Sequence, residues 1–222
     1  MALNKSKGNM YPWVTHTWNA IKGKCPHDCS YCYMKRYPQP ELHFDEEELK
    51  TDLGSGNIIF VGSSCDDFAL SIPSMWVDRQ LTICRFFPDN RYLFQSKMCG
   101  RFSLFKFPDN TILGTTIETN RYYHGITKAP RPWERMMAMT CIENYPKMVS
   151  IEPIMDFDID VLVRWMLEIK PEFVSIGADS GNNHLPEPSS DKVKALIEAL
   201  KDITEVKVKD NLKRLMSLTT DK

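Results

Sequence analysis

Short apolar segments rich in β-branched residues alternate with segments of helical period along the whole chain. Some of the apolar segments, such as residues 58–61 (Ile-Ile-Phe-Val), are apolar at every position instead of at every second one. Strands buried on both faces of a parallel sheet have this pattern. It predicts strands at residues 17–22, 57–62, 91–96, 111–118, 148–153, 173–178 and 206–209.

Two of the intervening segments place apolar residues on one face of a helix, at spacings i, i+3, i+4 and i+7. They are Ile159, Leu162, Val163 and Met166, and then Val193, Leu196, Ile197 and Leu200. Strands that alternate with such helices form βαβ units, which build an open sheet or a barrel. An eight-unit barrel typically takes about 250 residues, and this chain has 222. We therefore predict an α/β fold, a partial TIM-like barrel of six or seven β/α units with mostly parallel strands.

The domain organisation follows from the absence of any linker rich in Gly, Ser or Pro. We expect one domain over residues 1–222, with a polar lead-in (1–16), the partial barrel (17–209) and a C-terminal tail (210–222). In such folds the reactive groups collect at the carboxyl ends of the strands, where the barrel also has its mouth.

Composition narrows the function classes. The chain is 42% hydrophobic and 26% charged, and its 28 Lys and Arg against 29 Asp and Glu give a net charge of -1. Nothing in this total demands a polyanionic partner, although residues 1–40 and 79–106 are locally basic. Those stretches are either solvated faces or a basic rim for an anionic substrate. With no apolar run of roughly 20 residues and no secretory signal, the expected location is the cytoplasm, away from membranes.

The seven cysteines form an odd number in a chain without an export signal, so we expect no disulfide framework. Cys25, Cys29 and Cys32 lie within eight residues, directly after the first predicted strand. A zinc site would need a fourth ligand, and within the loop only His27 could supply it. Core cysteines without a metal are a further alternative, but the polar residues of the loop do not resemble a buried apolar segment. A four-iron cluster normally takes four thiolates. Three thiolates leave one iron open, and an open metal position marks a site that binds a cofactor or substrate.

The spacing Cys-x3-Cys-x2-Cys, with Tyr31 before the third cysteine, resembles the signature of the radical S-adenosylmethionine (SAM) superfamily. The resemblance implies that Cys25, Cys29 and Cys32 hold a [4Fe-4S] cluster and that SAM chelates the remaining iron. It also implies an external electron donor, similar to flavodoxin or ferredoxin, and reductive cleavage of SAM to methionine and a 5'-deoxyadenosyl radical that takes hydrogen from a substrate. The protein itself positions the cofactor and excludes water.

The ends of the predicted strands supply candidate SAM contacts, together with Tyr31. Thr116 and Glu118 share one face of their strand, as do Ser150 and Glu152 on the next, because side chains alternate along a strand. Two alternatives remain. Glu118 could form an ion pair with Arg121, and the chain after the strand that ends at Gly62 could be an ordinary turn into a helix. The full set of candidates is Tyr31, Gly62, Ser63, Thr116, Glu118, Ser150, Glu152 and Gly177.

Residues 18–209 also resemble a phage-associated radical-SAM-like family of uncharacterised function, through these strand ends, Gln95-Ser96-Lys97 and Lys207-Val208-Lys209. A more distant resemblance is to spore photoproduct lyase, a DNA-repair branch of the superfamily. That resemblance makes Cys65 and Cys99, which follow two strand ends, candidate catalytic hydrogen donors; the alternative is that both are buried filler. Cys84 and Cys141 follow apolar residues at helical spacing and are expected in the core.

Aromatic residues and basic stretches together permit a nucleotide or nucleic-acid substrate, although aromatics are more often used for packing. The aromatics in question are Tyr11, Trp13, Trp18, Tyr33, Tyr37, Tyr122, Tyr123 and Trp133. We therefore expect a radical SAM enzyme, a lyase or a modification enzyme, with an unidentified substrate. The alternatives are a zinc-binding interaction module and a cluster-binding barrel without turnover.

Overall fold

The computed structural model describes residues 3–217, so residues 1–2 and part of the expected C-terminal tail, 218–222, lie outside the described residues. Its main sheet has eight strands in the order β1-β2-β5-β6-β7-β8-β9-β10, and only β1 is antiparallel to its neighbour. These strands are β1 (Asn4–Lys5), β2 (His16–Trp18), β5 (Ile58–Val61), β6 (Arg91–Gln95), β7 (Thr111–Thr116), β8 (Lys147–Ile151), β9 (Phe173–Ile176) and β10 (Glu205–Val208).

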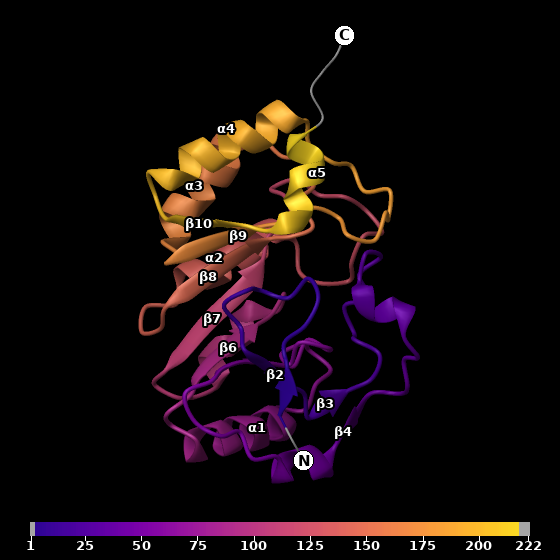
Figure 1. The fold of residues 1–222 in the computed structure, drawn as a ribbon, viewed down its shortest axis with the longest axis vertical. Helices are drawn as coiled ribbons and strands as arrows, with labels where there is room; N and C mark the ends of the chain where they lie inside the picture. The colour runs from indigo at the N-terminus through magenta and orange to yellow at the C-terminus, as the bar shows by residue number, and fades with distance from the viewer. Residues whose placement is uncertain (1–2, 218–222) are drawn as a thin grey trace.

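Helices alternate with most of the parallel strands, as a β/α architecture predicts. The α-helices are α1 (Ser74–Phe86), α2 (Pro132–Thr140), α3 (Ile159–Ile169), α4 (Ser190–Lys201) and α5 (Lys213–Met216). The 3-10 helices are η1 (Tyr33–Arg36), η2 (Glu46–Lys50), η3 (Cys99–Leu104) and η4 (Asp210–Leu212). Figure 1 shows α1 near the β2 end of the sheet and α3 and α4 near the β10 end. The expected mostly parallel partial barrel is confirmed, and the barrel is not closed.

The first predicted strand, 17–22, is wrong as one element. The chain leaves the main sheet after Trp18, and β3 (Ile21–Lys22) pairs instead with β4 (His43–Phe44) in a separate two-stranded sheet. The break falls at Asn19, whose side-chain oxygen accepts hydrogen bonds from the Ser63 hydroxyl and the Ser64 amide beyond the end of β5, both at 3.1 Å. The short second sheet leads directly into the three-cysteine loop.

The sheet is apolar on both faces, as the continuous apolar runs predict. Outward residues of the strands, such as Ile59 and Val149, are fully buried in one large cluster with the helices. The alternate residues, such as Leu93 and Met148, belong to a second, inner cluster. Strands of an open barrel would expose that inner face to water unless another part of the chain covered it.

The N-terminal segment covers the inner face. Tyr11 and Val14 are buried there, and Figure 1 shows the indigo segment running across the sheet. The Tyr11 ring stacks on Trp13 at 5.5 Å, and Trp13 meets Phe173 of β9 edge-on at 5.1 Å. Residues 10–14 therefore belong to the core of the barrel, although we expected residues 1–16 to form a polar lead-in.

The Tyr11→Ala variant should test how much this covering contributes. Loss of a buried aromatic ring typically costs about 3–5 kcal/mol, and Tyr11 also donates a hydrogen bond of 2.9 Å to Gln95. We expect the free energy of unfolding, measured by urea denaturation, to fall by that amount. Tyr37→Ala, at a side chain that is 60% exposed, should change it by less than about 0.5 kcal/mol. Equal effects at the two positions would contradict the assignment of residues 10–14 to the core.

The two remaining cysteines predicted as core have different outcomes. Cys84 on α1 is fully buried, which confirms its prediction. Cys141 is exposed, and so are Trp133 and Met137, which are about half exposed on α2. The prediction for Cys141 is wrong because Trp133 and Met137 lie on the solvent face of α2, and Cys141 follows them directly after the helix ends.

No helix within residues 3–217 combines the length and the hydrophobicity that a membrane crossing needs.

Candidate active site

The three-cysteine loop follows β3 and lies against the carboxyl ends of β5, β6 and β7. Its Cys29 thiol is buried, whereas Cys25 and Cys32 are partly exposed. Gly23 starts the loop at φ +104°, where a side chain would be strained and would also collide with the carbonyl of Glu41. The glycine therefore allows the chain to turn from β3 into the loop.

A segment between β7 and α2, residues 126–128, holds the loop from one side. The Ser30 amide donates to the Ile126 carbonyl and the Lys128 amide donates to the His27 carbonyl, both at 2.8 Å. The Lys128 ammonium also lies 3.0 Å from the Asp28 carboxylate. These contacts fix the backbone around Cys29 from a part of the chain about 100 residues away.

His27, the alternative zinc ligand, points to a carboxylate. Its Nε2 lies 2.9 Å from Oδ2 of Asp66, and both side chains are at least nine-tenths buried. Asp66 also accepts hydrogen bonds of 2.7 Å from the Ser96 hydroxyl and the Lys97 amide. Burial opposes ionisation, yet these hydrogen bonds and His27 together hold the pKa of Asp66 below its ordinary value. Asp66 thus ties the cysteine loop to the ends of β5 and β6.

The donor set of the loop suits an iron–sulfur cluster. All three side chains are free thiols, and thiolate sulfur is the ligand that such clusters take. A hydrogen bond with Cys65 is the largest factor that lowers the pKa of Cys25 to about 6. Residues 3–217 hold no group of three or more His, Cys, Asp or Glu side chains placed for a metal ion. The fit of the cluster therefore rests on the chemistry of the three thiols and on the groups around them.

Glu118, just past the end of β7, lies at the centre of a buried charge cluster. Arg135 of α2 donates to its Oε2 at 2.8 Å, and Lys97 Nζ lies 3.7 Å from its Oε1. The Tyr31 hydroxyl donates to Oε1 as well. Burial would raise the pKa of Glu118, but Arg135 and Lys97 outweigh it and lower the pKa. We call Tyr31, Lys97, Glu118 and Arg135 the Glu118 cluster.

The alternative pairing of Glu118 with Arg121 is wrong. Arg121 instead pairs with Asp156 and Asp158, and its contact with Asp158 is 2.6 Å. The buried partner, Arg135, also donates to the Thr116 carbonyl at 2.5 Å. Glu118 therefore has an ion-pair partner on α2, inside the protein, and faces the cysteine loop through Tyr31.

Glu152, just past the end of β8, has a second set of partners. Lys209 lies 2.8 Å from its Oε2, while the side-chain amides of Asn9 and Asn211 donate to its Oε1 at 2.9 and 3.0 Å. Lys209 also contacts the Asn9 carbonyl and lies 5.0 Å from the centre of the Tyr11 ring. The N-terminal segment and the end of β10 thus meet at this carboxylate.

Thr116 and Ser150 line the same interior between the two acids. The Thr116 hydroxyl accepts from Gln95 at 2.9 Å, and the other end of the Gln95 amide accepts from Tyr11. Burial is the largest factor that raises the pKa of Tyr11, with the charge of Glu152 next, and a hydrogen bond with Ser150 opposes it. Tyr11 and Gln95 therefore connect the strand-end pair Thr116 and Glu118 with the pair Ser150 and Glu152.

The two candidate glycines each leave room for a carboxylate. A side chain at Gly177 would meet the Glu152 carboxyl carbon at 2.7 Å, and Gly62, at φ +76°, lies against the carboxylate of Asp67. Ser63 accepts a hydrogen bond of 2.9 Å from Tyr33 through its carbonyl. Close packing accounts for both glycines, and their contact with SAM stays a prediction.

Asp67 gives a pH-dependent test of this packing. Its Oδ2 accepts from Gln80 at 2.7 Å, and its Oδ1 has no hydrogen-bond partner within residues 3–217. Burial raises its pKa well above the ordinary value. An aspartate with a raised pKa holds its proton in the fold, so stability is present at low pH and falls as the pH rises above about 4. We expect Asp67→Asn to unfold at the same urea concentration as the wild type at pH 4 but to be about 1–3 kcal/mol more stable at pH 8.

The control for that measurement is Asp109→Asn, at an exposed position. Its free energy of unfolding should differ from that of the wild type by less than about 0.5 kcal/mol at both pH values. A difference between Asp67→Asn and the wild type that stays constant from pH 4 to pH 8 would contradict the assigned titration.

Cys65 and Cys99, the candidate hydrogen donors, are both buried. Cys65 lies beside Cys25, and their hydrogen bond, followed by burial, raises its pKa. Cys99 donates to the Arg135 carbonyl at 3.3 Å from η3, and burial raises its pKa to about 11. Cys65 is therefore next to the cysteine loop, whereas Cys99 packs beneath α2.

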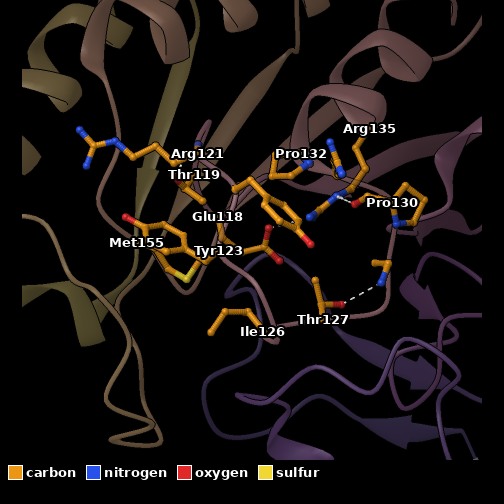
Figure 2. Close-up of a pocket in the computed structure, with 13 residues that line it drawn as sticks. Glu118, Thr119, Arg121, Tyr123, Ile126, Thr127, Pro130, Pro132, Arg135 and Met155 are labelled. Atoms are coloured by element: carbon orange, nitrogen blue, oxygen red, sulfur yellow. Dashed lines mark hydrogen bonds and ion pairs between the residues drawn. The ribbon is translucent and has the colours of Figure 1, made fainter.

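A small hollow lies beside the Glu118 cluster. The side chains that line it include Glu118, Tyr123, Thr127, Arg135 and Met155 (Figure 2). The loop that closes it also carries Tyr122, which is 59% exposed, with Arg131 above its ring at 4.7 Å. The hollow connects the end of β7 with the segment that holds Cys29.

Several residues of the site were not identified as such from the sequence. The sequence pattern assigns no role to Lys97 or Lys209, and it does not single out Asn9 or Arg135. Arg135 has a signal of its own, since it lies between Pro132 and Met139 on the buried stripe of α2. A cation on an apolar helix face points to a buried anion.

No protein-family model matches the sequence, and no curated protein matches it. Solved structures do. Spore photoproduct lyase, in a mutant with bound AdoMet and dinucleoside spore photoproduct, matches with a TM-score of 0.67 over 93% of this chain and 80% of that chain, at 9% identity.

The chain has the fold of spore photoproduct lyase. Streptococcus suis SuiB, bound to the precursor peptide SuiA, also matches, with a TM-score of 0.60 and 9% identity, over 89% of this chain and 49% of that chain. The expected distant resemblance to spore photoproduct lyase is therefore confirmed at the level of the fold. The phage-associated resemblance stays a prediction.

Proposed function

We propose that this protein is a radical SAM enzyme in which Cys25, Cys29 and Cys32 hold a [4Fe-4S] cluster. The observation that carries the proposal is the combination of this fold with three free thiols at the carboxyl ends of β5 to β7. Three protein ligands leave one iron for SAM. When bound, the cluster supplies the electron that cleaves SAM to methionine and a 5'-deoxyadenosyl radical.

The residues around the thiols would support such a centre. Lys97 and Arg135 bring positive charge close to Cys29, which offsets the negative charge of a thiolate-ligated cluster. The Asp66 contact with His27 and the 126–128 segment hold the loop backbone. Ligand orientation by such outer groups is a general requirement of metal sites.

The two strand-end carboxylates would orient SAM and the substrate. Oε1 of Glu118, which accepts from Tyr31, is the oxygen that a ribose hydroxyl would use, with Thr116 beside it. Ser150, Glu152 and Gly177 would contact SAM from the ends of β8 and β9, and Gly62 and Ser63 would contact it from the end of β5. The N-terminal segment, through Tyr11 and Trp13, keeps water from the inner face, which protects a radical.

The substrate we propose is a nucleotide or a nucleic-acid lesion. Spore photoproduct lyase has been solved with a dinucleoside spore photoproduct, and exposed tyrosines at Tyr33, Tyr37 and Tyr122 could stack on bases. Cys65 or Cys99 would return a hydrogen atom to the product radical in a lyase reaction. The electron would come from a flavodoxin- or ferredoxin-like protein in the cytoplasm, and the whole chain would act as one domain.

The experiment that tests the proposal is anaerobic reconstitution followed by turnover. We expect roughly four iron and four sulfide per chain, and 5'-deoxyadenosine once SAM and dithionite are added. Stoichiometric zinc without sulfide would favour the interaction module, and a cluster without 5'-deoxyadenosine would favour a barrel that has lost turnover. Either result contradicts the proposal.

The substrate class is tested on the same loaded protein with ultraviolet-irradiated and unirradiated oligonucleotides. Loss of a photoproduct by mass spectrometry, dependent on SAM, supports a nucleic-acid lesion. Equal 5'-deoxyadenosine formation with both oligonucleotides and no loss of any photoproduct contradicts it. A peptide substrate, as in the SuiB complex, would appear as turnover stimulated by peptide alone.

A further inference from the structure

The hydroxyl of Thr127 lies 3.2 Å from the sulfur of Cys29. Cys29 is the most buried of the three loop thiols, with 8% of its surface exposed. Thr127 comes from the segment between β7 and α2, not from the cysteine loop itself. The contact thus connects a proposed cluster ligand with a residue that is 98 positions away in sequence.

The position of the Thr127 hydroxyl is fixed by its own surroundings. The Ala129 amide donates to Oγ1 at 3.1 Å, and the His27 carbonyl lies 3.2 Å from the same oxygen. The backbone hydrogen bonds of Ile126 and Lys128 to the cysteine loop flank it on both sides. The hydroxyl therefore stays near Cys29 without depending on the sulfur to hold it.

The ligation state of Cys29 decides the direction of this hydrogen bond. A free thiol can donate to the hydroxyl or accept from it, but a sulfur that ligates iron carries no proton and can only accept. With Ala129 as donor to its oxygen, the Thr127 hydroxyl keeps its own proton for Cys29 or for the His27 carbonyl. The thiolate, which carries charge, is the stronger acceptor of the two.

We propose that Thr127 is a positioning residue whose hydroxyl donates to the sulfur of Cys29 and raises the reduction potential of the cluster. The inference rests on the proposed function. Hydrogen bonds to ligand sulfurs are one of the factors that set the potentials of iron–sulfur clusters. The bond is stronger to the reduced cluster, which carries one more electron, so it stabilises the reduced state.

The test is a redox titration of reconstituted protein, with the reduced cluster followed by electron paramagnetic resonance. Thr127→Val keeps the shape of the side chain and removes the donor, and its midpoint potential should fall below that of the wild type. Thr127→Ser keeps the hydroxyl donor, and its midpoint potential should equal that of the wild type. Thr204→Val removes a hydroxyl that donates to the Pro171 carbonyl at 2.8 Å, away from the loop, and should leave the potential unchanged.

Incomplete loading of a variant does not obscure the result, because the titration reads only molecules that carry a cluster. Equal potentials for Thr127→Val and the wild type would overturn the inference and leave the proposed function intact. A potential that falls as far in Thr127→Ser as in Thr127→Val would also overturn it, since the donor is then not the cause. A wild-type protein that forms no cubane overturns the proposed function and this inference with it.

Discussion

The Cys29→Ser variant is expected to lose its iron–sulfur chemistry while it keeps its fold. Serine replaces a soft thiolate with a hard, neutral hydroxyl, which is a poor ligand for an iron–sulfur cluster. After anaerobic reconstitution, iron should fall from roughly four per chain to below about one. The rate of 5'-deoxyadenosine formation should fall at least about 10³-fold, which corresponds to an activation free energy ~4 kcal/mol higher.

The matched control is Cys141→Ser. Cys141 is the exposed cysteine on the solvent side of α2, so iron content and the rate of 5'-deoxyadenosine formation should equal those of the wild type. Full iron loading of Cys29→Ser would contradict the assignment of Cys29 as a ligand. An equal loss of iron in both variants would contradict the special role of the loop.

The second large effect is expected at Arg135. Its contact with Glu118 is an ion pair in which both side chains are only 1–2% exposed. Arg135→Met would leave the carboxylate buried with Lys97 3.7 Å away as its remaining cation. Breaking one side of a buried pair typically costs about 3–5 kcal/mol, and we expect the free energy of unfolding, measured in urea, to fall by that amount.

Two further variants separate charge from packing in this result. Arg135→Met combined with Glu118→Gln removes both charges and should recover at least about 1 kcal/mol of the loss. Arg121→Met breaks an ion pair whose arginine is 36% exposed, and should cost about 0–1 kcal/mol. A double variant no more stable than Arg135→Met alone would show that volume, and not the buried charge, decides the effect.

The strands of this fold are visible in the sequence because burial on both faces leaves no polar position to interrupt a run such as 58–61. The phase of α2 was not visible in the same way. Trp133 and Met137 are large and apolar, and they suggested a buried stripe that continues to Cys141. The stripe that is buried contains Arg135, whose partner is on another element, so local spacing pointed to the wrong face.

The candidate site shows the same limit. The acids Glu118 and Glu152 could be chosen from the sequence because each follows a strand end, where an α/β fold collects its polar groups. Their partners could not, since Asn9 and Lys209 reach Glu152 from the two ends of the chain. The covering of the inner face by Tyr11 and Trp13 was equally hidden, because it depends on which side of an open barrel the N-terminal segment crosses.

The most direct test of the central claim is Mössbauer spectroscopy of protein reconstituted with ⁵⁷Fe under anaerobic conditions, with and without SAM. We expect a cubane cluster in which one iron changes its spectrum when SAM is added, while the other irons stay the same. A spectrum without a cubane, or one in which all the irons are unaffected by SAM, would contradict an iron left open by Cys25, Cys29 and Cys32.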